Sequence, residues 1–88
     1  VAREHNVVFA FENHPDERTP TDVRERIGSP APHLGVCLDT GWFGTYGYSA
    51  AQAASELADV LAHVHLKDVK EVGGHETCRY GAGVVDLE

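Results

Sequence analysis

The sequence predicts an α/β protein with a parallel sheet, in the order β-α-β-α-β, forming part of a β/α barrel. Short apolar runs alternate with segments that carry helix-start and helix-stop signals, as a parallel sheet with helical crossovers requires. Three of these runs end in a residue able to bind a metal ion: Glu12, Asp39 and His65. Asp39 follows Glu12 by 27 residues and His65 follows Asp39 by 26, close to the about 31 residues of one barrel unit.

The first expected strand, residues 7–12, is a continuous β-branched and aromatic run, typical of a parallel strand covered on both faces. Residues 1–6 before it are expected to be the end of a helix and its turn. A helix then begins after Thr19, whose hydroxyl suits the N-cap position, with Asp22 at the third helical position. Gly28, with prolines soon after it, is expected to end this helix.

The other expected elements continue the alternation. They are a strand at residues 34–39, a Gly- and aromatic-rich loop at 40–48, an Ala-rich helix from Ser49 to Asp59, a strand at 61–66 and a polar loop at 67–83. After a short extended piece at residues 84–85, Asp86 is expected to cap a further helix. Residues 1–88 are therefore expected to be one fragment of a larger barrel domain.

Strand side chains alternate between the two faces of a sheet. By this parity Glu12, Asp39 and His65 all point to the barrel interior at the carboxyl ends of their strands, where such folds keep their chemistry. Taken singly, each would more often be a strand-end cap or a core residue, but the shared spacing and parity favour one metal site. The large residues of the opposite face are expected to pack under helices: Val7, Phe9, Phe11, Leu34, Val36, Leu38, Val64 and Leu66.

Composition narrows the function classes. The 88 residues include 14 acidic and seven basic side chains, a net charge of −7, which argues against nucleic acid as a partner because phosphate binding needs a basic surface. No apolar stretch reaches the about 18 residues needed to cross a membrane. The spacing of Cys37 and Cys78 matches no zinc or redox motif, so both are expected to be unpaired thiols of a cytoplasmic protein.

Four motifs resemble those of one known family, in the same order along the chain. They are Phe11-Glu12-Asn13-His14, Cys37-Leu38-Asp39-Thr40-Gly41, His63-Val64-His65-Leu66-Lys67-Asp68 and Gly81-Ala82-Gly83-Val84-Val85-Asp86. The family is the sugar phosphate isomerase/epimerase family, the xylose isomerase-like TIM barrels, and the resemblance covers about strands five to seven. It implies a partial (β/α)8 TIM barrel from a metal-dependent sugar or sugar phosphate isomerase or epimerase.

The resemblance also implies roles for the three strand-end residues. Glu12, Asp39 and His65 would bind one divalent ion, Mn²⁺, Mg²⁺, Co²⁺ or Zn²⁺, and a fourth ligand, a Glu ending strand eight, would lie beyond this chain. The ion would polarise the carbonyl of a ketose and stabilise the enediolate formed when a carboxylate removes the adjacent proton. Glu12 would be that carboxylate, because its two oxygens allow it to be both ligand and base. The strand-eight Glu would be the second acid/base group.

Three further residues are candidates for substrate binding. Trp42 stands where many members have a His, and it is either a loop-packing residue or an apolar wall for the substrate. Lys67 either neutralises a substrate oxyanion or phosphate, or pairs with Asp68 or Glu71. His14 either contacts the substrate or is a solvated loop residue. The family's substrate-contacting Arg is replaced by Glu71, so the resemblance leaves the substrate class open.

Two alternatives stand beside the isomerase interpretation. The same proton abstraction would serve an inosose-dehydratase-like lyase, and the absence of an eighth strand favours a truncated, non-catalytic fragment. The expected partner is a small sugar or polyol, with neither nucleic acid nor a membrane. Copies of the chain are expected to associate, because three strands leave two edges unpaired. The isolated fragment is expected to be inactive.

Overall fold

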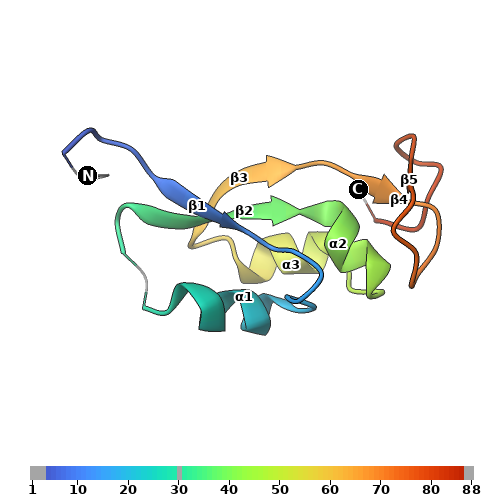
Figure 1. Ribbon diagram of the computed structural model, residues 1–88, viewed down its shortest axis with the longest axis horizontal. Helices are drawn as coiled ribbons and strands as arrows, with labels where there is room; N and C mark the ends of the chain where they lie inside the picture. Colours follow the sequence, from blue (N-terminus) through green and yellow to red (C-terminus); the bar gives the residue numbers. More distant parts are fainter. Residues whose placement is uncertain (1–3, 30, 87–88) are drawn as a thin grey trace.

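The computed structural model describes residues 4–29 and 31–86 and has the predicted α/β architecture (Figure 1). Its elements are, in order, β1 (Phe9–Glu12), α1 (Pro20–Ile27), β2 (Leu34–Asp39), α2 (Thr40–Thr45), α3 (Ala50–Glu56), β3 (Leu61–His65), β4 (Asp68–Val69) and β5 (Thr77–Cys78). Strands β1, β2 and β3 form a parallel sheet in that order, with β2 in the centre. The helix end expected at residues 1–6 lies partly outside the described residues, and residues 4–6 form a turn.

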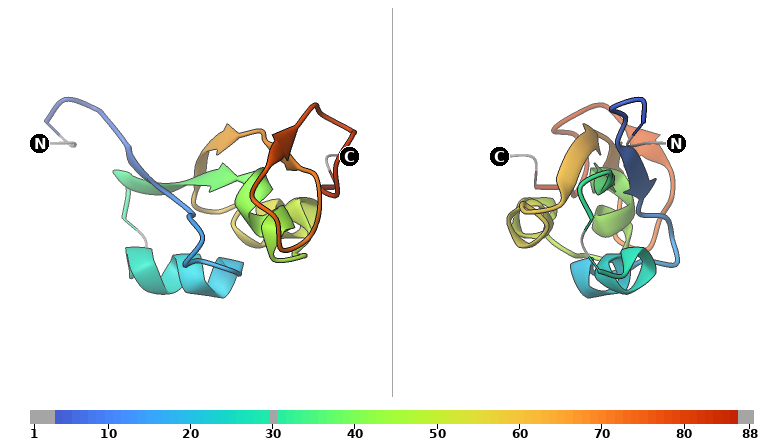
Figure 2. Two further views of the ribbon diagram at one scale, coloured as in Figure 1. Left: turned by 45° about the vertical axis from the view of Figure 1, so that its right-hand side comes forward. Right: turned by 90° about the vertical axis from the view of Figure 1, so that its left-hand side faces the viewer.

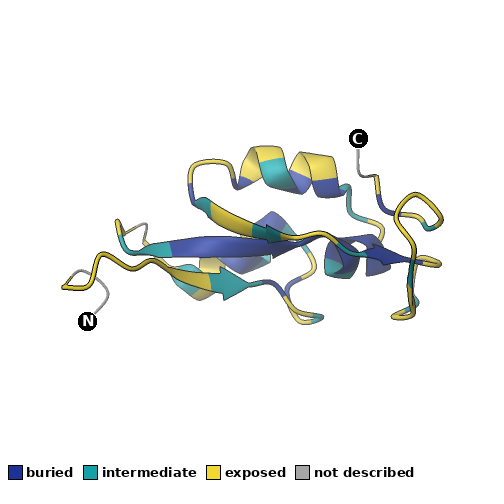
Figure 3. Cartoon of the chain, turned by 90° about the horizontal axis from the view of Figure 1, so that it is seen from above, coloured by how far each residue is buried: buried dark blue, intermediate teal, exposed yellow. Residues whose placement is uncertain are grey.

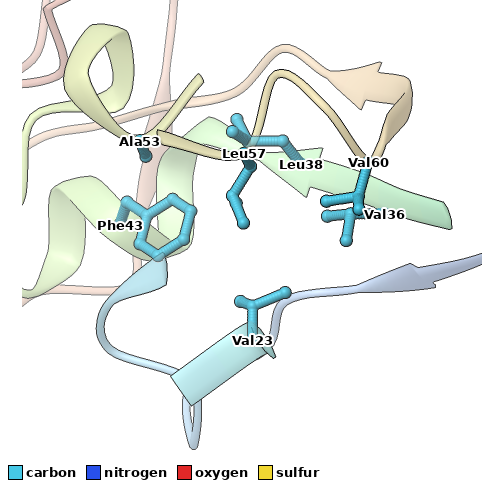
Figure 4. Packing of buried hydrophobic residues seen from close by; sticks show 7 residues of the cluster. All are labelled: Val23, Val36, Leu38, Phe43, Ala53, Leu57 and Val60. Carbon is cyan, nitrogen blue, oxygen red and sulfur yellow. The ribbon is translucent and has the colours of Figure 1, made fainter. Parts of the chain in front are cut away.

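Helices α1 and α3 lie on the same side of the parallel sheet (Figures 1 and 2). The main core fills the space between these helices and β2 (Figure 4) and consists of Val23, Val36, Leu38, Phe43, Ala53, Leu57 and Val60. Val36 and Leu38 point into this core, as the strand parity predicts. β2 is buried, whereas β1 and β3 are exposed or half-buried along their lengths (Figure 3).

Local signals in the sequence explain where the two crossover helices begin. The Thr19 hydroxyl accepts a hydrogen bond from the N–H of Asp22, and the Asp22 carboxylate accepts one from the N–H of Thr19. This reciprocal capping box confirms the predicted start of α1, and Gly28, with φ 70°, ends the helix. The Ser49 hydroxyl caps α3 by accepting a hydrogen bond from the N–H of Gln52, whose side chain turns to Glu56 and does not complete the predicted capping box. Helix α3 ends at Glu56, before the predicted Asp59.

Several predicted boundaries were wrong. The segment predicted as a loop after β2 begins with helix α2, because the Asp39 carboxylate accepts hydrogen bonds from the first free N–H groups of that helix. The predicted polar loop at 67–83 contains the antiparallel pair β4–β5. Val7, Phe9 and Leu66 do not pack under helices but are 46%, 57% and 57% exposed, since they lie at the ends of the edge strands.

Asp68 holds the segment of residues 79–86 against β4. Its Oδ1 accepts hydrogen bonds from the N–H groups of Val69 (2.9 Å) and Val85 (3.1 Å), and its Oδ2 accepts from those of Gly81 and Gly83 (both 3.1 Å). Gly83 has no room for a side chain, because a Cβ there would collide with the Asp68 carboxylate and the Val69 carbonyl oxygen.

Asp86 ends this segment and binds the start of α3. Its carboxylate accepts hydrogen bonds from the Ser49 hydroxyl and the N–H of Ala50. The further helix expected after Asp86 lies outside the described residues.

The strand register decides which side chains share a level of the sheet. Asp39 of β2 is the partner of His65 of β3, as equal strand ends would suggest. Glu12 of β1, however, is the partner of Cys37 and not of Asp39. The parallel strands are therefore staggered, as strands of a barrel must be, and the last residue of β1 lies two residues below the last residue of β2.

Candidate metal centre

Glu12 and His65 approach one another from β1 and β3, across the carboxyl end of β2. The Nδ1 atom of His65 lies 3.0 Å from Oε2 of Glu12. The His65 side chain is 50% exposed and that of Glu12 is 27% exposed, so both can be reached by a ligand. The structure thus brings together the first and third of the predicted ligands.

Asp39 lies beside this pair but is almost fully buried. Its Oδ1 accepts hydrogen bonds from the N–H groups of Gly41 (3.0 Å) and Trp42 (3.3 Å), and its Oδ2 lies 3.3 Å from Nζ of Lys67. The buried Asn13 side chain donates to the Asp39 carbonyl oxygen (3.0 Å) and accepts from its N–H (2.6 Å). Because Asn13 follows Glu12 directly, this amide ties the ends of β1 and β2 together.

The charges of Glu12 and Asp39 influence each other. Burial raises the pKa of Asp39 above its ordinary value; the Lys67 ammonium and the Trp42 N–H oppose this, and the nearby Glu12 adds to it. Burial also acts to raise the pKa of Glu12, but hydrogen bonds from His65 and Asp39 outweigh it, so this pKa is lowered. Glu12 is therefore the more readily ionised of the two carboxyl groups.

Lys67 is held in place from several sides. The Thr40 hydroxyl donates to its carbonyl oxygen (2.6 Å) and accepts from its N–H (2.8 Å). Gly41 makes room for its side chain, since a Cβ at that position would collide with the Lys67 methylenes. Its Nζ lies 4.2 Å from the centre of the Trp42 ring, within reach of a cation–π interaction. The partner of Lys67 is thus Asp39, and neither Asp68 nor Glu71.

Cys37 belongs to the same cluster, although its sequence motif does not single it out as a ligand. Donor atoms of Glu12, Cys37 and His65 all lie within 4.8 Å of one another. Cys37 is 5% exposed, and burial together with the charges of Glu12 and Asp39 raises the pKa of its thiol. Two signals could have found it: Cys37 shares a face with Asp39, and adjacent barrel strands are staggered.

The remaining predicted residues lie around this cluster. His14 is exposed and its charge helps to lower the pKa of Glu12. Trp42 is half-buried and meets the His75 ring edge-to-face, with 5.5 Å between ring centres. The ring of His63 meets that of His65 in the same way, also at 5.5 Å.

A separate hollow lies at the other end of the parallel strands. Its volume is about 670 Å³, and its lining is mostly apolar: Val8, Ala31, Pro32, Leu34, Gly35, Asp59, Val60, Leu61 and Ala62. It contains none of the predicted site residues. The titratable groups gather instead at the carboxyl ends of the strands, where parallel α/β folds carry their active sites.

The donor set fits a divalent cation. Two carboxyl groups lie close enough to shift each other's pKa in opposite directions, and a cation between them would relieve that repulsion. Carboxylate oxygen, imidazole nitrogen and thiol sulfur are ligands found in protein metal sites.

Over residues 1–88 the sequence matches the family model described as xylose isomerase-like TIM barrel. The chain belongs to this family. Among curated proteins and solved structures, none was found to match it. Membership of the xylose isomerase-like family confirms the resemblance seen in the four motifs and agrees with a partial barrel for the three-stranded parallel sheet.

Xylose isomerase-like barrels are largely enzymes, and many bind a metal ion. Within residues 4–29 and 31–86 of this member, no helix is both long and apolar enough to span a membrane.

Proposed function

We propose that this chain carries part of the active site of a metal-dependent isomerase or epimerase that acts on a sugar or sugar phosphate. The observation that supports this most is the approach of Glu12 and His65 to within 3.0 Å beside the buried Asp39. These residues come from three successive strands of a xylose isomerase-like barrel. The fourth ligand and the second acid/base group would come from outside these 88 residues.

In this proposal Glu12, Asp39 and His65 hold one divalent ion. When bound, the ion supplies a Lewis acid that polarises the substrate carbonyl and so acidifies the adjacent C–H bond. Glu12 removes that proton. The Glu12 side chain is 27% exposed, so a substrate can reach this carboxylate and transfer a proton to it. His65, whose ring lies against the same carboxylate, fixes the orientation of Glu12.

The substrate would lie on the open side of this cluster. Lys67 is 30% exposed and carries its ammonium beside Asp39, so it can meet an oxyanion or a phosphate of the substrate. Trp42 supports the Lys67 ammonium with its ring and offers an apolar wall next to it. His14, exposed after β1, would contact the substrate from the other side of Glu12.

Metal binding can be tested on this chain by titration with Mn²⁺, followed by electron paramagnetic resonance. We expect one ion per chain, bound more weakly by roughly 100-fold in His65→Asn. His33→Asn is the matched control, because His33 lies just before β2 at the opposite end of the sheet, and it should change the affinity little. Equal affinity in His65→Asn and the unchanged chain would contradict the proposed site.

Catalysis is tested in a longer protein that contains these residues. Glu12→Gln should lower turnover by about 10²–10⁴-fold, the usual contribution of a general base. Full turnover in that variant would exclude the proposed base. Reaction in D₂O separates the two enzyme classes: an epimer or isomer carrying deuterium supports our proposal, whereas a product lacking one water identifies the lyase alternative.

A further inference from the structure

We infer that Cys37 is a direct ligand of the metal ion, through its thiolate, together with Glu12 and His65. The site would then prefer Zn²⁺ or Co²⁺ over Mg²⁺, because sulfur ligands favour the former and not the latter. This inference rests on the proposed function, since it concerns the ion bound at the same site, and it adds the identity of a ligand and the class of metal.

Strands β1 and β2 are staggered, and this stagger places Cys37 beside Glu12. Glu12 is paired with Cys37 in the parallel sheet, so these two side chains stand next to each other on the same face. His65 reaches the pair from β3, with its Nδ1 3.0 Å from Glu12. Cys37, buried in the central strand between them, therefore lies beneath the two accessible ligands.

The donor atoms of the three residues are close enough together to bind one ion. Tetrahedral coordination with bonds of about 2.0–2.3 Å places ligand atoms about 3.3–3.6 Å apart. The donor atoms of Glu12, Cys37 and His65 already lie within 4.8 Å of one another, so side-chain rotations alone can bring them to that spacing. Cys37 would join Glu12, Asp39 and His65 in the ligand set, and it would be the one member of that set that offers sulfur.

Asp39 is less free to bind an ion than Glu12 and His65 are. Both of its carboxylate oxygens already have partners: the N–H groups of Gly41 and Trp42 on one side and the Lys67 ammonium on the other. To bind an ion closely, Asp39 must weaken its contact with Lys67. Cys37 is the sheet partner of Glu12, so its thiolate can add to the ligand set beside Asp39.

The sulfur content of the chain allows a decisive test. The chain contains two cysteines and no methionine, so Cys37 is the only sulfur atom left in a Cys78→Ser variant. Cys78 lies on β5 and is not part of the cluster. We would titrate the Cys78→Ser chain with Co²⁺ and record the near-ultraviolet band that arises from charge transfer between thiolate sulfur and cobalt.

We expect that band at one Co²⁺ per chain, and Zn²⁺ should displace the cobalt while Mg²⁺ should not. Cys37→Ser should abolish the band and lower Zn²⁺ affinity by at least roughly 10–100-fold. Circular dichroism of Cys37→Ser checks that it folds; if it does not, the Cys78→Ser titration still decides the question.

The two ways of failing are distinct. Co²⁺ that binds without a sulfur band, and is lost in His65→Asn, would overturn the role of Cys37 and leave the proposed metal site intact. A chain that binds no Co²⁺ or Mn²⁺ at all would contradict both the thiolate ligand and the metal site.

Discussion

Two buried aspartates near the carboxyl ends of the parallel strands differ in their hydrogen-bond partners and in the direction in which their pKa values are shifted. Asp39 and Asp68 are each 1% exposed. Asp68 is surrounded by four backbone N–H groups, which outweigh the effect of burial and lower its pKa. Asp39 has two such groups and otherwise faces charged side chains, Lys67 and Glu12, and its pKa is raised. Backbone N–H groups thus stabilise the ionised form of Asp68, whereas burial and the nearby Glu12 disfavour the ionised form of Asp39.

This difference separates a structural carboxylate from a candidate catalytic one. Backbone donors are fixed by the fold, so a carboxylate bound by them gains stability and loses the freedom to bind anything else. Side-chain partners can move aside, and perturbed acids of this kind concentrate at functional sites. By this criterion Asp68 is a structural residue, whereas Asp39 is the better candidate for the proposed metal site.

The largest expected effect is that of Asp68→Asn on stability. Whichever way the amide is turned, its NH₂ group faces two of the four backbone N–H groups. We expect the free energy of unfolding to fall by about 3 kcal/mol or more, as for buried hydrogen bonds to a charged group. Urea denaturation followed by circular dichroism measures this change.

Asp39→Asn is the matched control for that experiment. An amide at position 39 can keep its oxygen toward Gly41 and Trp42 while the half-buried Lys67 side chain moves away. Its loss should therefore stay below about 1.5 kcal/mol. Equal losses in the two variants would remove the distinction between the aspartates.

The pH dependence of stability should differ in sign between the two sites. A lowered pKa in the folded state stabilises the protein above the ordinary Asp pKa, about 3.9, and this contribution is lost as the pH falls through the lowered value. A raised pKa has the opposite effect: it opposes folding above about 3.9, and the penalty disappears as the pH falls below the raised value.

Urea midpoints in metal-free buffer from about pH 7 to pH 3 would show this. Relative to Asp39→Asn, the unchanged chain should gain stability on acidification. Relative to Asp68→Asn, it should lose stability, and only in the most acidic part of the range. Parallel curves for the two comparisons would contradict the assigned pKa directions.

The smallest expected effect concerns Lys67. If its ammonium competes with the metal for Asp39, Lys67→Gln should strengthen Mn²⁺ binding roughly fivefold, which corresponds to about 1 kcal/mol of charge repulsion removed. Lys70→Gln is the control, since Lys70 pairs with the exposed Glu76. Weaker binding in Lys67→Gln would show instead that Lys67 organises Asp39 for the ion.

Most of the fold could be predicted from local patterns. The apolar runs gave β1, β2 and β3, and the Thr19 capping box gave the start of α1. Helix α2 was missed because its sequence, with Gly41 and Gly44, has low helix propensity, and the Asp39 cap and tertiary packing override that preference. Strands β4 and β5 have two residues each and are too short to show any periodicity in the sequence.

The site was harder to predict than the fold. The intervals between Glu12, Asp39 and His65 in the sequence suggest that the three strands end at the same height in the sheet. The true heights depend on how the strands pair, which the intervals do not show. The stagger of β1 against β2 brings Cys37 to Glu12. Nor could the sequence show that Lys67 contacts Asp39, since that contact depends on Gly41 leaving space beside the strand.

The arrangement around Asp68 has a consequence for how this barrel can evolve. Its carboxylate binds backbone N–H groups only, so it holds Gly81, Gly83 and Val85 without contacting any side chain of the segment. Exposed positions such as Arg79 and Ala82 can therefore change while the backbone stays in place. A single acid at position 68 would therefore let the exposed side chains of the neighbouring loop vary while the backbone keeps its path.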